Sequence, residues 1–96
     1  MKLVFIAYNE ALDDELTAAL EGLSIDTYTK WTRVLGKGRT SGPHLGSPVW
    51  PKHNNVLAVC VQDDEAQAVL EAVRGLRAEM GRHGIKAFVL PCEEVT

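Results

Sequence analysis

Residues 56–61 read VLAVCV, an apolar run with no polar position on either face. Such a run is typical of a central strand whose two faces are both covered, by helices or by another subunit. The chain continues with QDDE at 62–65 and then with apolar residues at helical spacing: Ala66, Val69, Leu70, Val73, Leu76 and Met80. This spacing predicts a helix with an acidic start that ends at Gly81 and Gly84. The stretch therefore predicts a buried strand that leads directly into a helix.

Strand and helix patterns recur on both sides of this stretch. Residues 2–8, KLVFIAY, and 85–90, IKAFVL, are short runs rich in β-branched and aromatic residues, so each predicts a strand, and Pro91 ends the second one. Residues 27–35, TYTKWTRVL, predict a more exposed strand. A first helix, with acids in its first turn and Gly22 near its end, is predicted by the spacing of Leu12, Leu16, Ala19, Leu20 and Leu23.

The predicted elements follow one another in the order β-α-β-β-α-β. Two right-handed βαβ-type crossovers bring the first and third strands to the middle of the sheet and both helices to one face. The sequence therefore predicts an α+β, ferredoxin-like βαββαβ sandwich, with an antiparallel four-stranded sheet and two helices on one face, as a single domain over residues 1–96. Because a chain of 96 residues leaves much apolar surface exposed as a monomer, we expect it to oligomerise.

Composition sets the class of protein. Hydrophobic residues make up 46% and charged residues 24% of the chain, which is typical of a soluble globular protein. No apolar run reaches the length of a membrane span, and the start, MKLVFIAYNE, has no cleavage-site pattern, so we expect a cytoplasmic protein without membrane insertion. Cys60 and Cys92 lie in or beside apolar runs, where buried free thiols are expected.

Residues 36–55, GKGRTSGPHLGSPVWPKHNN, form a long connection between the second and third strands, where the predicted fold needs only a tight turn. We therefore expect an insertion with a functional role. Between residues 30 and 52 the chain has no acid but carries Lys37, Arg39 and Lys52, although its net charge is −3. This local positive field favours an anionic ligand or partner and argues against general binding of nucleic acid.

The start of this connection combines groups that suit an anion. Gly36 and Gly38 flank Lys37 and precede Arg39 and Thr40, so backbone amides, a hydroxyl and two cations follow the end of a strand. Such a nest can hold a phosphate or a carboxylate. The order of residues is not that of a Walker A loop. The alternative is that the glycines only allow a sharp exit from the strand and that the cations are solvated.

The rest of the connection offers candidates for a partner or a metal. Trp50 lies between two prolines, and it either anchors a partner or packs on its own sheet. We take His44, Trp50 and Lys52 as partner-binding candidates. No histidine or cysteine pair has the spacing of a metal site such as CxxC or HxxxH, so exposed histidines are favoured over a site built on His44 and His53.

Two further classes of function find little support. No Ser/His/Asp or Cys/His arrangement is supported locally, and Asp13, Asp14 and Glu15 fit acids that stabilise the start of a helix, so we do not expect an enzyme. An RNA-binding version of this fold carries aromatic residues on its central strands for base stacking. Residues 56–61 have none, so no nucleic-acid partner is expected.

Three segments resemble the nitrogen-regulatory PII signalling family and its PII-like relatives. They are LDDELTAAL at 12–20, VLGKGRT at 34–40 and GIKAFVL at 84–90. The second is similar to the glycine-x-glycine-arginine at the root of the family's long T-loop. CutA-type divalent-ion tolerance proteins share the superfamily's architecture and are the alternative, with His44, His53 and Cys92 as the ligands of copper or zinc.

The resemblance implies a compact homotrimer with ligand clefts between subunits. In PII proteins these clefts bind ATP or ADP, and the T-loop engages a target such as a transporter, an enzyme or a regulator. Carried over by position, Gly36, Gly38 and Arg39 line the cleft from the loop root, and Lys86 matches the lysine that contacts phosphate. Lys37 and Thr40 complete the expected ligand-binding set.

The sequence departs from the family in two places that affect the ligand. The glycine-rich segment before the last strand is shortened to GRHGIK, and PCEEVT at 91–96 replaces the family's basic residues beyond that strand. Each missing charge-assisted contact to phosphate is worth ~1.5–3 kcal/mol. The expected effector therefore includes AMP-like ligands and smaller anions beside ATP and ADP. The loop has no tyrosine, so uridylylation is not expected.

Overall fold

A computed structural model describes residues 1–37, 53–80 and 84–96. The predicted order of elements is confirmed, with a short 3-10 turn before the first helix. The elements are β1 (Lys2–Asn9), the 3-10 turn (Glu10–Leu12), α1 (Asp13–Gly22), β2 (Thr29–Leu35), β3 (His53–Val61), α2 (Asp63–Met80) and β4 (Ile85–Pro91).

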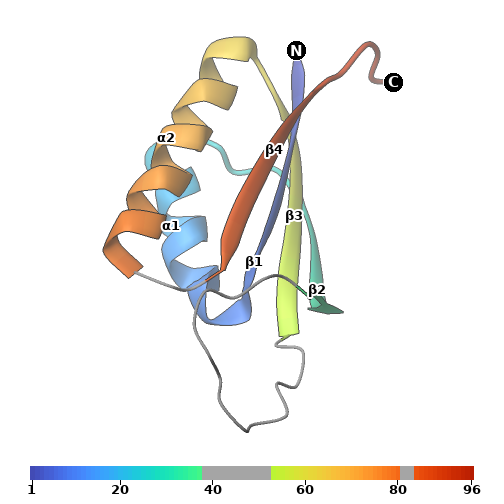
Figure 1. Ribbon diagram of the computed structural model, residues 1–96. Helices are drawn as coiled ribbons and strands as arrows, with labels where there is room; N and C mark the ends of the chain where they lie inside the picture. Colours follow the sequence, from blue (N-terminus) through green and yellow to red (C-terminus); the bar gives the residue numbers. More distant parts are fainter. Residues whose placement is uncertain (38–52, 81–83) are drawn as a thin grey trace, which may run out of the picture.

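The four strands form one antiparallel sheet in the order β2-β3-β1-β4, so the first and third strands lie in the middle as predicted. Both helices cover the same face, and the other face of the sheet is left open (Figure 1). Within the described ranges, neither helix is long and apolar enough to span a membrane.

The core lies between the helices and one face of the sheet. Alternate residues of β1, namely Val4, Ile6 and Tyr8, point toward the helices and are buried. They pack in a cluster with residues such as Leu16 of α1 and Val69 of α2, which are both fully buried. Burying an aliphatic side chain of this size stabilises a fold by about 1.5–3 kcal/mol. Buried apolar residues recur at every second position in the strands and at about every 3.6 positions in the helices. This spacing determines which face of the sheet the helices cover.

The limits of two strands differ from the prediction. Strand β2 begins at Thr29 and not at residue 27. Strand β3 begins at His53 and not at residue 56, so the long connection runs from 36 to 52 and not to 55. The strand is longer because Asn54 and Asn55 pair with Asn9 and Tyr8 of β1, and because the Asn55 side chain is buried and hydrogen-bonded.

The start of α2 confirms the acidic cap read from QDDE. The Glu65 carboxylate accepts a hydrogen bond from the backbone N–H of Gln62 at 2.9 Å. This is half of a capping box, because it satisfies an amide that has no partner within the helix. The cap fixes the point at which β3 turns into α2.

At the end of α1, the backbone of Ser24 adopts a conformation that favours glycine. The N–H of Ser24 donates to the Glu21 carbonyl at 2.9 Å and that of Ile25 to the Leu20 carbonyl at 2.9 Å, the two bonds of a Schellman motif. Ser24 has a φ of 61°, a left-handed conformation that costs a residue with a Cβ about 1 kcal/mol. We expect Ser24→Gly to raise the free energy of unfolding by about 0.5 kcal/mol in urea denaturation. A loss of stability would contradict this account of the helix end.

Candidate functional site

The ends of the long connection lie at one end of the sheet, together with the ends of the other two strands. Leu35 pairs with His53, Asn54 with Asn9, and Tyr8 with Ile85, so the end of β2, the start of β3, the end of β1 and the start of β4 are gathered there. The start of α1 lies at the same end (Figure 1). We call this region the loop-root end.

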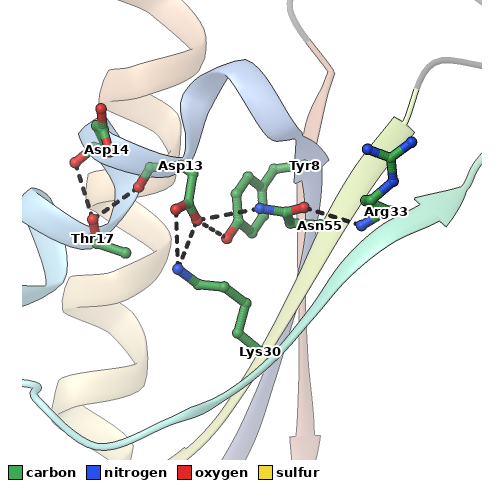
Figure 2. Close-up of polar contacts among 7 residues, drawn as sticks. All are labelled: Tyr8, Asp13, Asp14, Thr17, Lys30, Arg33 and Asn55. Atoms are coloured by element: carbon green, nitrogen blue, oxygen red, sulfur yellow. Dashed lines mark hydrogen bonds and ion pairs between the residues drawn. The ribbon is translucent and has the colours of Figure 1, made fainter.

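A polar network centred on Asp13 lies at the loop-root end, on the helix side of the sheet (Figure 2). The Tyr8 hydroxyl donates to Asp13 Oδ1 at 2.6 Å, and Lys30 Nζ lies 2.9 Å from Oδ1 and 3.0 Å from Oδ2. The Asn55 side-chain amide donates to the same carboxylate at 3.4 Å. One carboxylate of the α1 start therefore joins three strands: β1, β2 and β3.

Electrostatics favour the ionised form of Asp13. Partial burial raises the pKa of this carboxyl, but the hydrogen bonds from Tyr8 and Lys30 and the charge of Lys30 outweigh it, so the pKa lies below its ordinary value. For Tyr8, burial together with the hydrogen bond to the Asp13 carboxylate raises the pKa above its ordinary value. Asp13 is therefore an acceptor and Tyr8 a donor at any pH near neutrality.

The network extends to an irregular point in β2. The register of β2 against β3 shifts between Trp31 and Val34, and Arg33 in this bulge has a φ of 57°. The backbone N–H of Arg33 donates to the Asn55 side-chain oxygen at 3.4 Å (Figure 2). A bulge re-aims the residues that follow it. Asn55 thus links the Asp13 carboxylate to the part of β2 that leads into the connection.

Of the predicted ligand-binding residues, Gly36, Lys37 and Lys86 lie in the described part of the chain. Gly36 comes directly after β2 and lies close to β3. A Cβ on Gly36 would lie 2.2 Å from the Asn54 side-chain nitrogen. Lys37 is exposed beside it. Lys86 is exposed near the start of β4, opposite Ala7, where Arg77 of α2 holds the neighbouring Ile85 carbonyl at 2.8 Å.

The remaining predicted residues of the connection lie outside the described residues. These are Gly38, Arg39 and Thr40 of the ligand-binding set, and His44, Trp50 and Lys52 of the partner-binding set. Glycine was expected at position 36 because it lets a ligand approach the backbone. The structure shows a second reason for glycine there, which is the close approach of the Asn54 side chain.

The three described ligand-binding residues lie at two different edges of the sheet. Gly36 and Lys37 follow β2, and Lys86 lies on β4, and these strands are the two opposite edges of the sheet. Three interstrand spacings of about 4.8 Å separate the edges, roughly 14 Å in all. Within one chain the backbones of the two sets are therefore well separated.

The alternative metal site is weakened by the same topology. His53 lies at the loop-root end, whereas Cys92 follows β4 beside Met1 at the other end of β1, roughly 25 Å away for an eight-residue strand. These two predicted ligands therefore cannot share a metal within one chain. Across 1–37, 53–80 and 84–96, no three His, Cys, Asp or Glu side chains gather as a metal site would require. His44 lies outside these ranges.

The sequence analysis missed the Asp13 network. Asp13 is one of three successive acids in the first turn of α1, and the pattern alone gives it the same role as Asp14 and Glu15. Asn55 was assigned to the connection. A signal was present in Lys30, which lies between threonine and aromatic residues of a strand. A cation that is half-buried at such a position needs an acid as its partner.

The open face of the sheet is apolar. It carries Phe5 and Phe88, whose rings lie 6.1 Å apart, and beside them Leu3 and Leu90, which line a shallow apolar groove. Trp31, Phe88 and Leu90 are each about half exposed. VLAVCV was predicted to be covered on both faces, but within one chain only the face of Leu57, Val59 and Val61 is buried.

The family pattern described as nitrogen regulatory protein P-II matches residues 1–96, the full length of the sequence. The chain belongs to this family. Its members are regulatory proteins and not enzymes, so this P-II family protein is a signalling protein without catalytic activity. No match was found among curated protein sequences.

Solved structures of PII-like proteins share the fold of the chain. A PII-like signalling protein from Thermus thermophilus is 23% identical, with a TM-score of 0.63 over 93% of this chain and 83% of that one. CPII from Thiomonas intermedia K12, bound to ADP, AMP and bicarbonate, is 19% identical, with a TM-score of 0.68 over 93% and 86%. A second CPII structure, with ADP and bicarbonate, is 20% identical, with a TM-score of 0.68 over 93% and 82%. At these identities the likeness establishes the fold alone.

Proposed function

We propose that the chain is a PII-like sensor that binds a small anionic effector in clefts between the subunits of a homotrimer. The residues from 36 to 52 form one wall of each cleft and report the bound effector to a partner protein, such as a transporter, an enzyme or a regulator. The observation that carries this proposal is the separation of Lys86 from Gly36 and Lys37 at opposite edges of the sheet. Two neighbouring chains, each supplying one edge, would bring these groups to a single ligand.

The two edges of the sheet support a closed ring of subunits. When the β2 edge of one chain meets the β4 edge of the next, two different surfaces are in contact, and such heterologous contacts close into a ring if the rotation is correct. Three copies complete the ring in the proposed homotrimer. The apolar open face supports the same arrangement, because large exposed apolar patches commonly mark interfaces between proteins.

The effector we propose is an adenine nucleotide, ADP or AMP before ATP, with bicarbonate as a smaller alternative. Lys86 and Lys37 are exposed cations at the two walls, and Arg39 follows in sequence. A charged side chain that contacts a phosphate contributes about 1.5–3 kcal/mol. CPII, which shares the fold, was solved with ADP, AMP and bicarbonate. The acidic end, EE at 93–94, disfavours the more highly charged triphosphate.

Calorimetric titration with ADP and AMP tests the role of the cations. We expect Lys86→Gln and Arg39→Ala each to weaken binding by about tenfold to a hundredfold, since each loses one charge-assisted contact. Arg74→Gln is the matched control, because it removes a positive charge from the exposed face of α2, where Arg74 pairs with Glu71. Equal affinities for the wild type and for both cleft variants would show that the assignment is wrong.

A further inference from the structure

Within the described ranges, two residues other than glycine have a left-handed backbone: Ser24, with a φ of 61°, and Arg33, with a φ of 57°. The hydrogen bonds at the end of α1 account for Ser24. Arg33 lies instead inside the edge strand β2, where the register against β3 shifts between Trp31 and Val34. A bulge with a left-handed residue commonly has glycine there, because glycine has no Cβ to clash. The chain therefore carries an arginine where the backbone favours glycine.

The bulge is held in place from a distant part of the chain. The backbone N–H of Arg33 donates to the Asn55 side-chain oxygen at 3.4 Å. Asn55 is only 5% exposed, and its amide donates to the Asp13 carboxylate, so its own position is fixed. Residues that their surroundings hold in an unfavourable conformation cluster at ligand sites. The conformation of Arg33 therefore points to a role for its side chain.

The Arg33 side chain is available to a ligand. It is exposed, and Figure 2 shows its guanidinium pointing away from Asp13. In the part of the chain that the structure describes, no ion pair or side-chain hydrogen bond involves this guanidinium. Other cations there do have partners: Lys30 and Arg74 each have a carboxylate, and Arg77 has a backbone carbonyl. The N–H donors of Arg33 can therefore bind an anion.

We propose that Arg33 is a further anion-binding residue of the effector site, aimed by the β2 bulge at a phosphate group of the nucleotide. The inference rests on the proposed function and adds a cation to the cleft wall that contains Gly36 and Lys37. Arg33 precedes Gly36 by three residues, at most about 10 Å along the chain. A guanidinium can hold two phosphate oxygens at once, whereas the ammonium of Lys37 acts as a point charge.

Stability and binding should respond in opposite directions when Arg33 is replaced by glycine. Arg33→Gly removes the Cβ that opposes the left-handed backbone, so the melting temperature of the unliganded protein should rise by about 2–4 °C. The same change removes a charge-assisted contact, so the dissociation constant for ADP should rise about tenfold or more. Arg33→Gln keeps the Cβ, and it should weaken ADP binding equally while the melting temperature stays close to that of the wild type.

Two control variants separate the contact from changes in stability or net charge. Ser24→Gly relieves the other left-handed residue, so it should raise the melting temperature by a similar amount and leave the affinity for ADP unchanged. Arg74→Gln removes a positive charge from the exposed face of α2 and should leave ADP binding unchanged. A purely structural role for Arg33 would not reduce the affinity in a variant that is more stable than the wild type.

Calorimetric titration with ADP and thermal unfolding of the wild type and these variants test the inference. If the wild type binds ADP and both Arg33 variants bind it equally well, the inference is overturned, and the proposed function still stands on Lys86→Gln and Arg39→Ala. A wild type that binds neither ADP nor AMP overturns both. An Arg33→Gly protein that melts below the wild type would overturn the argument that arginine is kept at a position that favours glycine.

Discussion

Asp13→Ala is expected to lower the free energy of unfolding by about 2–3 kcal/mol. The variant leaves the Tyr8 hydroxyl buried without its acceptor and Lys30 half-buried without its counter-ion. Breaking a buried ion pair by removing one partner costs about 3–5 kcal/mol, and the expected value is lower because both side chains are partly exposed. Urea denaturation of the two proteins measures the difference.

Asp14→Ala is the matched control for this prediction. Asp14 is the next residue of the same helix turn and is exposed, and its side chain makes no hydrogen bond within the described part of the chain. Its loss removes only an interaction with the helix dipole, worth about 0.3–1 kcal/mol. If the two variants lose equal stability, the network is not what distinguishes Asp13.

The same network predicts how stability depends on pH. The pKa of Asp13 is lower in the folded chain than in the unfolded chain, so its contribution is complete above the ordinary pKa of about 3.9 and is lost as the pH falls through the folded value. Asp13→Asn removes this titration. The difference in unfolding free energy between the wild type and Asp13→Asn should therefore shrink as the pH is lowered below about 4.

The second large effect is expected at Phe88 on the open face. We expect the wild type, with a chain mass of 10.5 kDa, to have about three times that mass in light scattering, and Phe88→Glu to be monomeric. Phe88 is 46% exposed in the single chain, so a charge there costs the isolated fold little. In an assembly that covers Phe5 and Phe88, the same charge would be buried without a partner.

Val95→Glu provides the comparison for Phe88. Val95 is 58% exposed and follows β4, so Val95→Glu adds the same charge in place of an exposed apolar side chain outside the four strands. We expect this variant to keep the mass of the wild type. A monomeric wild type, or a Phe88→Glu protein that assembles normally, would contradict an interface on the open face.

Most of the fold follows from patterns that the sequence shows directly. Alternation in KLVFIAY and helical spacing from Ala66 to Leu76 are local properties, and the crossover rule then places β1 and β3 in the middle of the sheet. The start of β3 was missed because asparagine is a poor strand former. Asn55 is tolerated there only through its bonds to Asp13 and Arg33, which come from distant parts of the chain.

The candidate site was less predictable, for a physical reason. Whether one side chain contacts another depends on the strand register and on the exact path of the backbone. Hydrophobic patterns do not determine either of these to an accuracy of one residue. Asp13 and Asp14 are equivalent in sequence, and one helix position decides that only Asp13 reaches Tyr8 and Lys30.

The most direct test of the central claim is thermal unfolding of the wild type with ADP, AMP, ATP, bicarbonate, copper and zinc, one at a time. A ligand that binds only the folded protein adds about 2.7 kcal/mol at 100 times its dissociation constant. We predict that ADP or AMP raises the melting temperature. If no nucleotide and no bicarbonate changes it, or if only a metal does, the account of a sensor for small anions is wrong.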